Sequence, residues 1–274
     1  IITGLVGSEM CIRDSHSLGV QDYLFLTIKS PALLPSLQAM KPLIGKDTTI
    51  ITCMNGIPHW YFHKLDNKYA NYKIKCLDPN LLIDTILPPD NIVGSVVYPA
   101  CEIVKPGTIK HIAGNRFSLG EPEGSESDRL KFISDILKRA GFRAPIQKNI
   151  RDEIWLKLIG NLSFNPISAL TGATLEQICN DQGTEAIVRA MMTEAKIIAE
   201  ELGAKINMSI EKRIDGARKV GAHKTSMLQD IEAGKPIEID SIIIAVKELG
   251  ELTCSPTPCL LYTSDAADDA RSVD

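Results

Sequence analysis

The sequence predicts an α/β protein in which a domain with a parallel sheet is followed by an all-helical domain. In the first half, short apolar runs of β-forming residues alternate with amphipathic stretches, as in βαβ units. After Lys148 the periodicity is helical throughout. The length of 274 residues suits one large or two ordinary domains. We therefore expect a first domain over residues 16–148 and a second over 149–258.

The first elements form a βαβ unit. A short apolar strand at 22–28 is followed by Lys29, and Pro31 suits the start of a helix because its ring fixes φ near the helical value. That helix gains an apolar face from Leu33, Leu34, Leu37 and Met40. A second strand at 48–53 leads to Asn55. Since ligands bind at the carboxyl ends of parallel strands, Lys29 and Asn55 lie at the edge where a ligand is expected.

Strand-like runs separated by Pro and Gly follow, and we expect them to extend the sheet with antiparallel members. These strands are expected at 92–98, 102–104, 108–112 and 117–119. A helix at 126–140, stopped by Gly141, and a strand near 142–146 complete the first domain. The helices of the second domain are expected at 149–165, 182–202, 210–220 and 236–250.

The composition excludes several classes of protein. With 44% hydrophobic and 23% charged residues, the chain is neither disordered nor collagen-like. The aliphatic run Ile242–Val246 is far shorter than the ~20 apolar residues of a membrane span, so we expect no membrane partner. The chain has 30 basic and 34 acidic residues without clustered Lys/Arg runs, which predicts no binding to nucleic acid.

Cysteine and histidine spacing predicts neither disulfides nor a metal site. The seven cysteines include no C-x-x-C pair, which favours free thiols in a reducing compartment, and we expect a cytoplasmic protein. His59 and His63 could meet on one helix face, but no third ligand stands at a convincing spacing. Packed or surface histidines are the simpler interpretation, so no metal is expected.

Both ends of the sequence differ from the middle. Residues 4–15 and 259–274 lack amphipathic periodicity and ordered turn chemistry, and they resemble translated sequencing-adapter read-through. We therefore expect residues 1–15 and 259–274 to be non-native tails around a fragment of a natural protein. A signal peptide and a damaged glycine loop at Gly4 and Gly7 are the weaker alternatives for the first stretch. The signal peptide lacks a basic n-region and a long apolar core, and the loop lacks a preceding strand and a third glycine.

A stripe of polar residues marks the first helix of the second domain. Lys157, Asn161 and Asn165 are spaced i, i+4, i+8 and share one face of a helix that is otherwise almost entirely apolar. Polar groups in a buried helix need partners or face a pocket. A lysine that can donate a proton, flanked by two amides, suits the reduction of a carbonyl compound. A polar seam between packed helices is an equally good explanation.

A second polar segment, Lys224–Asp240, combines hydroxyl groups with carboxylates beside an apolar helix. Pro236 predicts the start of that helix, which places Glu238 and Asp240 in its first turn. Acidic residues there favour the helix dipole, so a purely structural role explains at least one of them. Ser226 is the other candidate for chemistry in this segment.

Taken together, these residues resemble the ketopantoate reductase family. Four pieces carry the resemblance in their joint order and spacing: FLTIKS at 25–30, NGIP at 55–58, KLIGNLSFNP at 157–166 and SMLQDIEAGKPIEID at 226–240. The resemblance covers essentially all of residues 16–258. It implies a Rossmann-type dinucleotide-binding domain, a helical catalytic domain and NADPH-dependent reduction of 2-dehydropantoate (ketopantoate) to pantoate in pantothenate biosynthesis.

The resemblance also implies roles for individual residues. Lys157 matches the catalytic lysine that would protonate the developing alkoxide, and Glu238 matches a carboxylate near the nicotinamide and the reacting carbon. Asn161 and Asn165 match amides that hold the substrate, and Ser226 matches a hydroxyl that receives its carboxylate.

Two further residues match the cofactor side of the family site. Asn55 matches a residue between cofactor and substrate, and Lys29 matches a cofactor contact. The chain departs from the family pattern in lacking the strand and G-x-G-x-x-G loop that hold the pyrophosphate. A Rossmann-type domain is therefore expected to be incomplete here, and cofactor binding by this fragment is expected to be impaired. At Thr174-Leu175 an asparagine that some members carry is also missing.

Two alternatives to this function remain open on the sequence. One is a reductase of another branched or hydroxylated 2-oxoacid, and the other is a non-catalytic binding or assembly module that keeps the fold. The expected partner is a small-molecule 2-oxoacid, and a homodimer is possible. The sequence does not decide between NADPH and NADH, because the discriminating region of the family pattern is missing.

Overall fold

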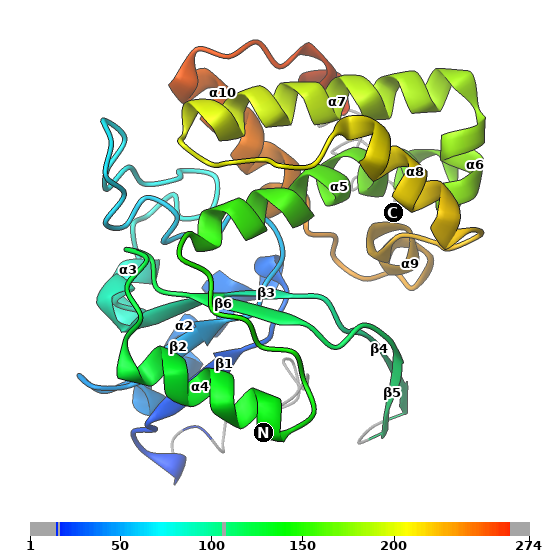
Figure 1. Ribbon diagram of the computed structural model, residues 1–274. Helices are drawn as coiled ribbons and strands as arrows, with labels where there is room; N and C mark the ends of the chain where they lie inside the picture. The colour runs from blue at the N-terminus through cyan, green and yellow to red at the C-terminus, as the bar shows by residue number, and fades with distance from the viewer. Residues whose placement is uncertain (1–14, 16, 106–107, 264–274) are drawn as a thin grey trace. The chain divides into compact units, whose positions relative to one another are not determined.

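A computed structural model of the chain describes residues 15, 17–105 and 108–263 (Figure 1). The chain divides into two compact units. The first contains residues up to 73 together with 80–153, and the second contains 74–79 together with the residues from 154 onward. Within the described residues, no helix has the length and hydropathy needed to cross a membrane. The predicted α/β class, with a parallel sheet before a helical part, is confirmed.

The sheet of the first unit has the strand order β1-β2-β3-β6. Its strands are β1 (Tyr23–Leu26), β2 (Thr49–Thr52), β3 (Ile92–Val97) and β6 (Phe117–Gly120). The first three are parallel, and β6 pairs antiparallel with β3. Every residue of β2 is buried, as expected for a central strand covered on both faces.

Helices cover this sheet. Between β1 and β2 the chain forms η1 (Ser30–Ala32), α2 (Leu33–Met40) and η2 (Lys41–Leu43). Leu33, Leu37 and Met40 are buried as expected, but Leu34 is largely exposed, so the apolar face of α2 is narrower than predicted. Short helical turns α3 (Ile83–Ile86) and η3 (Pro89–Asn91) precede β3. Helix α4 (Asp128–Arg139) packs Leu130, Ile133 and Leu137 against residues of β2, β3 and β6.

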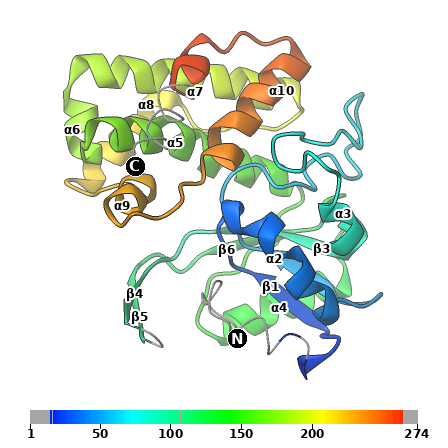
Figure 2. The same cartoon turned by 180° about the vertical axis from the view of Figure 1, so that it is seen from behind.

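Two expected strands do not extend the main sheet. Strands β4 (Ala100–Lys105) and β5 (Thr108–Ala113) form a separate hairpin whose residues are all exposed (Figures 1 and 2). The reason is that β6 occupies the free edge of β3, with Val97 opposite Phe117 and Gly94 opposite Gly120. The strand expected near 142–146 is reduced to two isolated bridges, at Arg143 and Ile146.

The second unit is helical. It contains most of α5 (Ile150–Thr171), then α6 (Leu175–Asn180), α7 (Gln182–Glu201), α8 (Ile210–Val220), α9 (Ser226–Glu232), the π-helical turn η4 (Asp240–Ile244) and α10 (Ala245–Thr253). Helices α7 and α8 lie where the periodicity places them. Helix α5 is longer than expected because it continues through Pro166 to Thr171. The helix expected from Pro236 begins only near Asp240.

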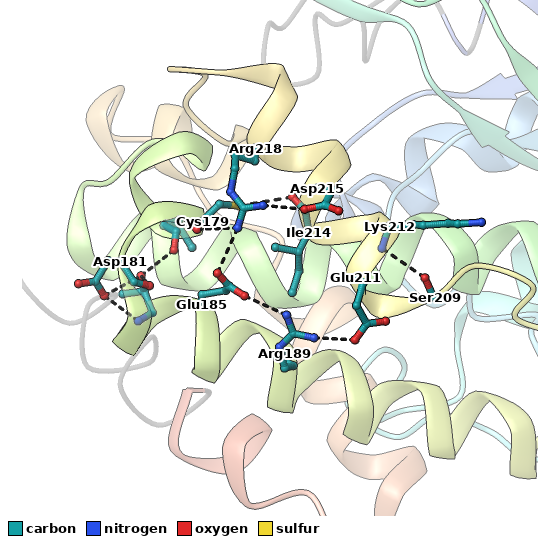
Figure 3. A network of polar contacts seen from close by, with 12 residues as sticks. Cys179, Asp181, Glu185, Arg189, Ser209, Glu211, Lys212, Ile214, Asp215 and Arg218 are labelled. Carbon is teal, nitrogen blue, oxygen red and sulfur yellow. Dashed lines mark hydrogen bonds and ion pairs between the residues drawn. The ribbon is translucent and has the colours of Figure 1, made fainter.

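Ion pairs join α7 and α8, and a hydrogen bond from α8 reaches α6 (Figure 3). The Arg218 guanidinium bonds to Asp215, to Glu185 and to the carbonyl of Cys179 in α6. Arg189 in turn bonds to Glu185 and Glu211. We call these five charged side chains the α6–α8 network. It links the three helices through side chains that are between 27% and 67% exposed.

The described part of the expected C-terminal tail is packed. Residues 258–263 are helical, and the Glu194 carboxylate accepts the backbone N–H groups of Cys259 and Leu260 at 2.8 and 3.0 Å. Leu260 is fully buried. The assignment of 1–15 and 259–274 as non-native tails stays a prediction, and residues 1–14 and 264–274 lie outside the described residues.

Candidate functional site

The polar stripe lies on α5. Lys157, Asn161 and Asn165 follow one another at one-turn intervals on the same face. Lys157 and Asn161 are half-buried and Asn165 is buried. The remaining faces of the helix bury large apolar side chains, including Trp155, Leu158, Ile159, Leu162 and Phe164. A basic group and two amides are therefore held in fixed order along a rigid, mostly buried helix.

A glycine within the stripe has a packing role. Gly160 lies between Lys157 and Asn161 in the sequence, and a Cβ placed there would clash with the guanidinium of Arg213 in α8. The absence of a side chain at Gly160 thus lets the Arg213 guanidinium lie against α5. Periodicity alone does not predict this contact, because Arg213 is distant in the sequence.

The hydroxyl pair of the second segment divides into a structural and a candidate functional residue. The Thr225 side chain accepts the backbone N–H of Leu228 and so caps α9. Ser226 opens the helix with an exposed side chain. Because Thr225 already supplies the cap, Ser226 remains the hydroxyl that could meet a ligand.

Glu238 lies outside the helix that follows it. Its side chain is 6% exposed, and its backbone carbonyl accepts the N–H of Ile242 at 3.3 Å. The expectation that Glu238 sits in the first turn is wrong, because the π-helical turn begins at Asp240. The helix-dipole explanation therefore applies to Asp240, which stands in the first turn. Single π-helical turns inside α-helices are frequent at functional sites.

Lys29 and Asn55 belong to the first unit. Lys29 precedes η1 just after β1, and Asn55 follows β2 in a turn where Gly56 has φ of +85°. Because β1 and β2 are parallel, both residues lie beyond the carboxyl end of the sheet. The five other candidate residues, Lys157, Asn161, Asn165, Ser226 and Glu238, all belong to the second unit.

The loop after Asn55 is fixed to the carboxyl end of the sheet by Trp60. Its indole N–H donates to Thr52 Oγ1 at 3.0 Å. A Cβ at Gly94 would lie 2.5 Å from the indole ring, so glycine in β3 makes room for it. The sequence alone does not show that Trp60 and Gly94 hold this loop, because the contact between them depends on the fold. The only signal in the sequence is a tryptophan shortly after the end of a strand.

Among the described residues, no group of three His, Cys, Asp or Glu side chains could hold a metal ion. His59 is buried, and His63 lies 3.2 Å from Asp90. The candidate residues are two lysines, one buried carboxylate, three amides and a hydroxyl, divided between the two units.

Comparison with known proteins assigns the family. The family model described as "Ketopantoate reductase PanE/ApbA" matches residues 6–124. The model described as "Ketopantoate reductase PanE/ApbA C terminal" matches residues 149–269. A 2-dehydropantoate 2-reductase of Mesorhizobium japonicum is 48% identical over 246 residues, which cover 90% of this chain and 76% of that protein. The chain belongs to the ketopantoate reductase family.

Solved structures show the same fold. A structure from Ralstonia solanacearum MolK2, provisionally named a ketopantoate reductase, has a TM-score of 0.90 and 37% identity over 94% of this chain and 78% of that one. The 2-dehydropantoate 2-reductase of Methylococcus capsulatus has a TM-score of 0.80 and 27% identity. The alignment covers 96% of this chain and 79% of that one. A D-mandelate dehydrogenase with NADH shares the fold, with a TM-score of 0.76 and 21% identity. The alignment covers 91% of this chain and 76% of that one.

Proposed function

We propose that this ketopantoate reductase family member reduces 2-dehydropantoate to pantoate with NADPH as hydride donor. The proposal depends on one observation above others. A relative 48% identical over nine-tenths of the chain is a 2-dehydropantoate 2-reductase. The polar stripe of α5 supports the proposal, because it presents the lysine and two amides that carbonyl reduction of a hydroxylated acid needs.

Lys157 is the proposed proton donor. Hydride addition to the carbonyl carbon turns the ketone oxygen into an alkoxide, and an ammonium bonded to that oxygen stabilises the growing negative charge and then gives up its proton. This interaction strengthens in the transition state, which is the condition for acceleration rather than mere binding. Asn161 and Asn165, one and two turns further along α5, would hold the polar groups of the substrate, and Ser226 would donate to its carboxylate.

Glu238 and Asn55 are the proposed residues near the reacting centre. The Glu238 carboxylate is buried and its position is set by the start of η4. Asn55 is proposed to contact both substrate and cofactor from the loop after β2, and Lys29 to contact the cofactor alone. What NADPH supplies is a hydride for the carbonyl carbon.

The described residues of the first unit fit a dinucleotide. A cation and an amide follow two neighbouring parallel strands at their carboxyl ends, which is where open α/β sheets bind nucleotides. The negative pyrophosphate and the nicotinamide amide of such a ligand are matched by an ammonium and by a side-chain amide. The preference for NADPH over NADH is part of the proposal.

A substrate and cofactor panel tests the proposal. The protein produced from its complete gene is given ketopantoate or other branched 2-oxoacids, with NADPH or NADH, while cofactor absorbance is followed. We expect the highest kcat/KM for ketopantoate with NADPH. A higher value for another 2-oxoacid would identify that acid as the substrate instead. No turnover, with a melting temperature that NADPH does not shift, would indicate a non-catalytic module.

Two further expectations stay predictions. We propose a cytoplasmic enzyme and a possible homodimer. Light scattering of the purified protein measures the second directly, and a monomer mass would contradict it.

A further inference from the structure

Two charged residues in the first turn of α5, Arg151 and Glu153, are not used by the candidate site. Arg151 is 5% exposed, and its guanidinium donates to the backbone carbonyls of Tyr61 and His63, both at 2.7 Å, and of Pro122. Burial lowers the pKa of Arg151. This cation therefore fixes the start of the helix to the loop that follows Asn55.

Glu153 fixes the same turn to the sheet. Its carboxylate accepts from Arg116 Nη2 at 2.6 Å, from Ser118 Oγ at 3.1 Å and from the Tyr98 hydroxyl at 3.2 Å. Tyr98 follows β3 and Ser118 lies in β6, so these donors come from the carboxyl end of β3 and the strand beside it. All four side chains belong to the first unit.

The anchored turn is directly followed by the proposed catalytic lysine. Helix α5 is continuous from Ile150 to Thr171, and Glu153 and Lys157 are i and i+4 on one face. A helix transmits a shift or rotation of its first turn to the next one. The ammonium of Lys157 must meet the ketone oxygen at hydrogen-bond distance in the transition state, so small displacements matter.

We propose that Glu153 is a positioning residue for Lys157. Its three hydrogen bonds hold the first turn of α5 in the orientation from which Lys157 reaches the substrate. This inference rests on the proposed function, but it makes a separate claim about the environment of Lys157. A role confined to stability is the competing explanation, since a buried ion pair also affects folding when it is broken.

The chain offers a matched control for that alternative. The Glu121 carboxylate, 1% exposed, accepts from Arg129 Nε and Nη2 at 2.8 and 2.6 Å and from the Ser127 hydroxyl. It is also a buried carboxylate held by an arginine and a serine in the first unit. Its side-chain partners belong to α4 and its cap, and the neighbouring Pro122 carbonyl accepts from Arg151, so Glu121→Gln weakens the unit while leaving the three hydrogen bonds of Glu153 in place.

The kinetic test compares Glu153→Ala, Glu153→Gln and Glu121→Gln in the protein from the complete gene. We expect Glu153→Ala to lower kcat about 10- to 100-fold with a small change in KM, because the lysine acts in the transition state. Glu153→Gln keeps the shape and should recover part of kcat. Glu121→Gln should lower the melting temperature without lowering kcat. An unchanged kcat in folded Glu153→Ala, or an equal loss in Glu121→Gln, would overturn the proposal.

A second measurement does not depend on turnover. The rate at which an anhydride acylates Lys157 is followed against pH by peptide mass spectrometry, with Lys196 as an internal reference. We expect the Lys157 profile to change in Glu153→Ala and to stay the same in Glu121→Gln, while Lys196 is unaffected in both. Identical Lys157 profiles in all proteins would refute positioning by Glu153. If wild-type protein shows no ketopantoate turnover but the profiles differ as expected, only the proposed function fails.

Discussion

The anchor of α5 and the α6–α8 network are both clusters of arginines and carboxylates, but they differ in their access to water. Arg151 and Glu153 are largely buried, and the side-chain hydrogen bonds described for them reach residues at least 29 positions away in the sequence. In the α6–α8 network, the exposure of the five side chains runs from 27% for Glu185 to 67% for Glu211. Several of its pairs are i, i+3 or i, i+4 neighbours on one helix.

This difference determines what each cluster can contribute. Removing one partner of a buried, hydrogen-bonded charge leaves the others without water or a replacement, at a cost of about 3–5 kcal/mol. An exposed pair loses little, about 0–1 kcal/mol, because water and salt already compete for it. The buried anchor can therefore fix the orientation of α5, whereas the exposed network adds modest stability to helices that pack through their apolar faces.

The largest effect is expected at Arg151. Arg151→Met removes the donors to three backbone carbonyls and should lower the free energy of unfolding by about 3–5 kcal/mol. Urea denaturation measures it. Arg151→Lys, which keeps the charge but not the fork of donors, should recover only part of the loss. If Arg151→Met lowers the free energy of unfolding by less than about 1 kcal/mol, the anchor stabilises the protein no more than an exposed ion pair does.

A smaller loss is expected at Arg116. Its side chain is 33% exposed and holds Glu153 by one 2.6 Å bond, while Ser118 and Tyr98 remain as donors when it is replaced. Arg116→Met should cost about 1–2 kcal/mol in the same denaturation experiment. A double-mutant cycle with Glu153→Gln should give a clear coupling energy. Strict additivity would show that the two side chains act independently.

In the exposed network we expect a small and salt-dependent effect. Arg218→Ala removes bonds to Asp215, Glu185 and the Cys179 carbonyl, yet the cost should be about 1 kcal/mol or less. The cost should fall further in high salt, which screens exposed charges. A loss as large in 1 M salt as in dilute buffer would mean that packing of the Arg218 side chain, and not its charge, stabilises these helices.

The smallest effect is expected at Asp181, an exposed residue whose carboxylate accepts the backbone N–H of Thr184 at the start of α7. That bond lowers the pKa of Asp181 in the folded protein. A lowered pKa stabilises the fold above the ordinary aspartate range, and this contribution disappears as pH falls through the lowered value. In Asp181→Asn the side chain can still cap the helix but does not titrate. The free energy of unfolding of this variant should therefore change less between neutral and acid pH than that of the wild-type protein. Parallel pH curves for the two proteins would disprove the contribution.

The same contrast explains how far sequence alone predicts this protein. Elements defined by local pattern, such as β2, α7 and α8, lie close to their expected bounds, because periodicity reports one buried face. Helix α6 was missed although Thr174 and Gln177 form a capping box that is visible in the sequence. The hairpin β4–β5 was misplaced because only the pairing of β6 with β3 shows that the sheet edge is taken.

Site residues divide in the same manner. The stripe from Lys157 to Asn165 follows from helical spacing, and the roles of its members remain proposals. Arg151 and Glu153 could not be found from spacing, since their partners are 29 to 90 residues away. The position of Glu238 ahead of a π-helical turn was equally hidden, because Pro236 predicts an earlier helix start than the chain adopts.

The most direct test of the account concerns Lys157 itself. Ketopantoate-dependent oxidation of NADPH is measured for the wild-type protein from its complete gene, for Lys157→Ala and for Lys196→Ala, a half-buried lysine on α7. We expect Lys157→Ala to lose at least about 100-fold in kcat, the scale of a lost proton donor, while Lys196→Ala keeps wild-type activity. Wild-type turnover in folded Lys157→Ala would contradict the central claim that this lysine donates the proton.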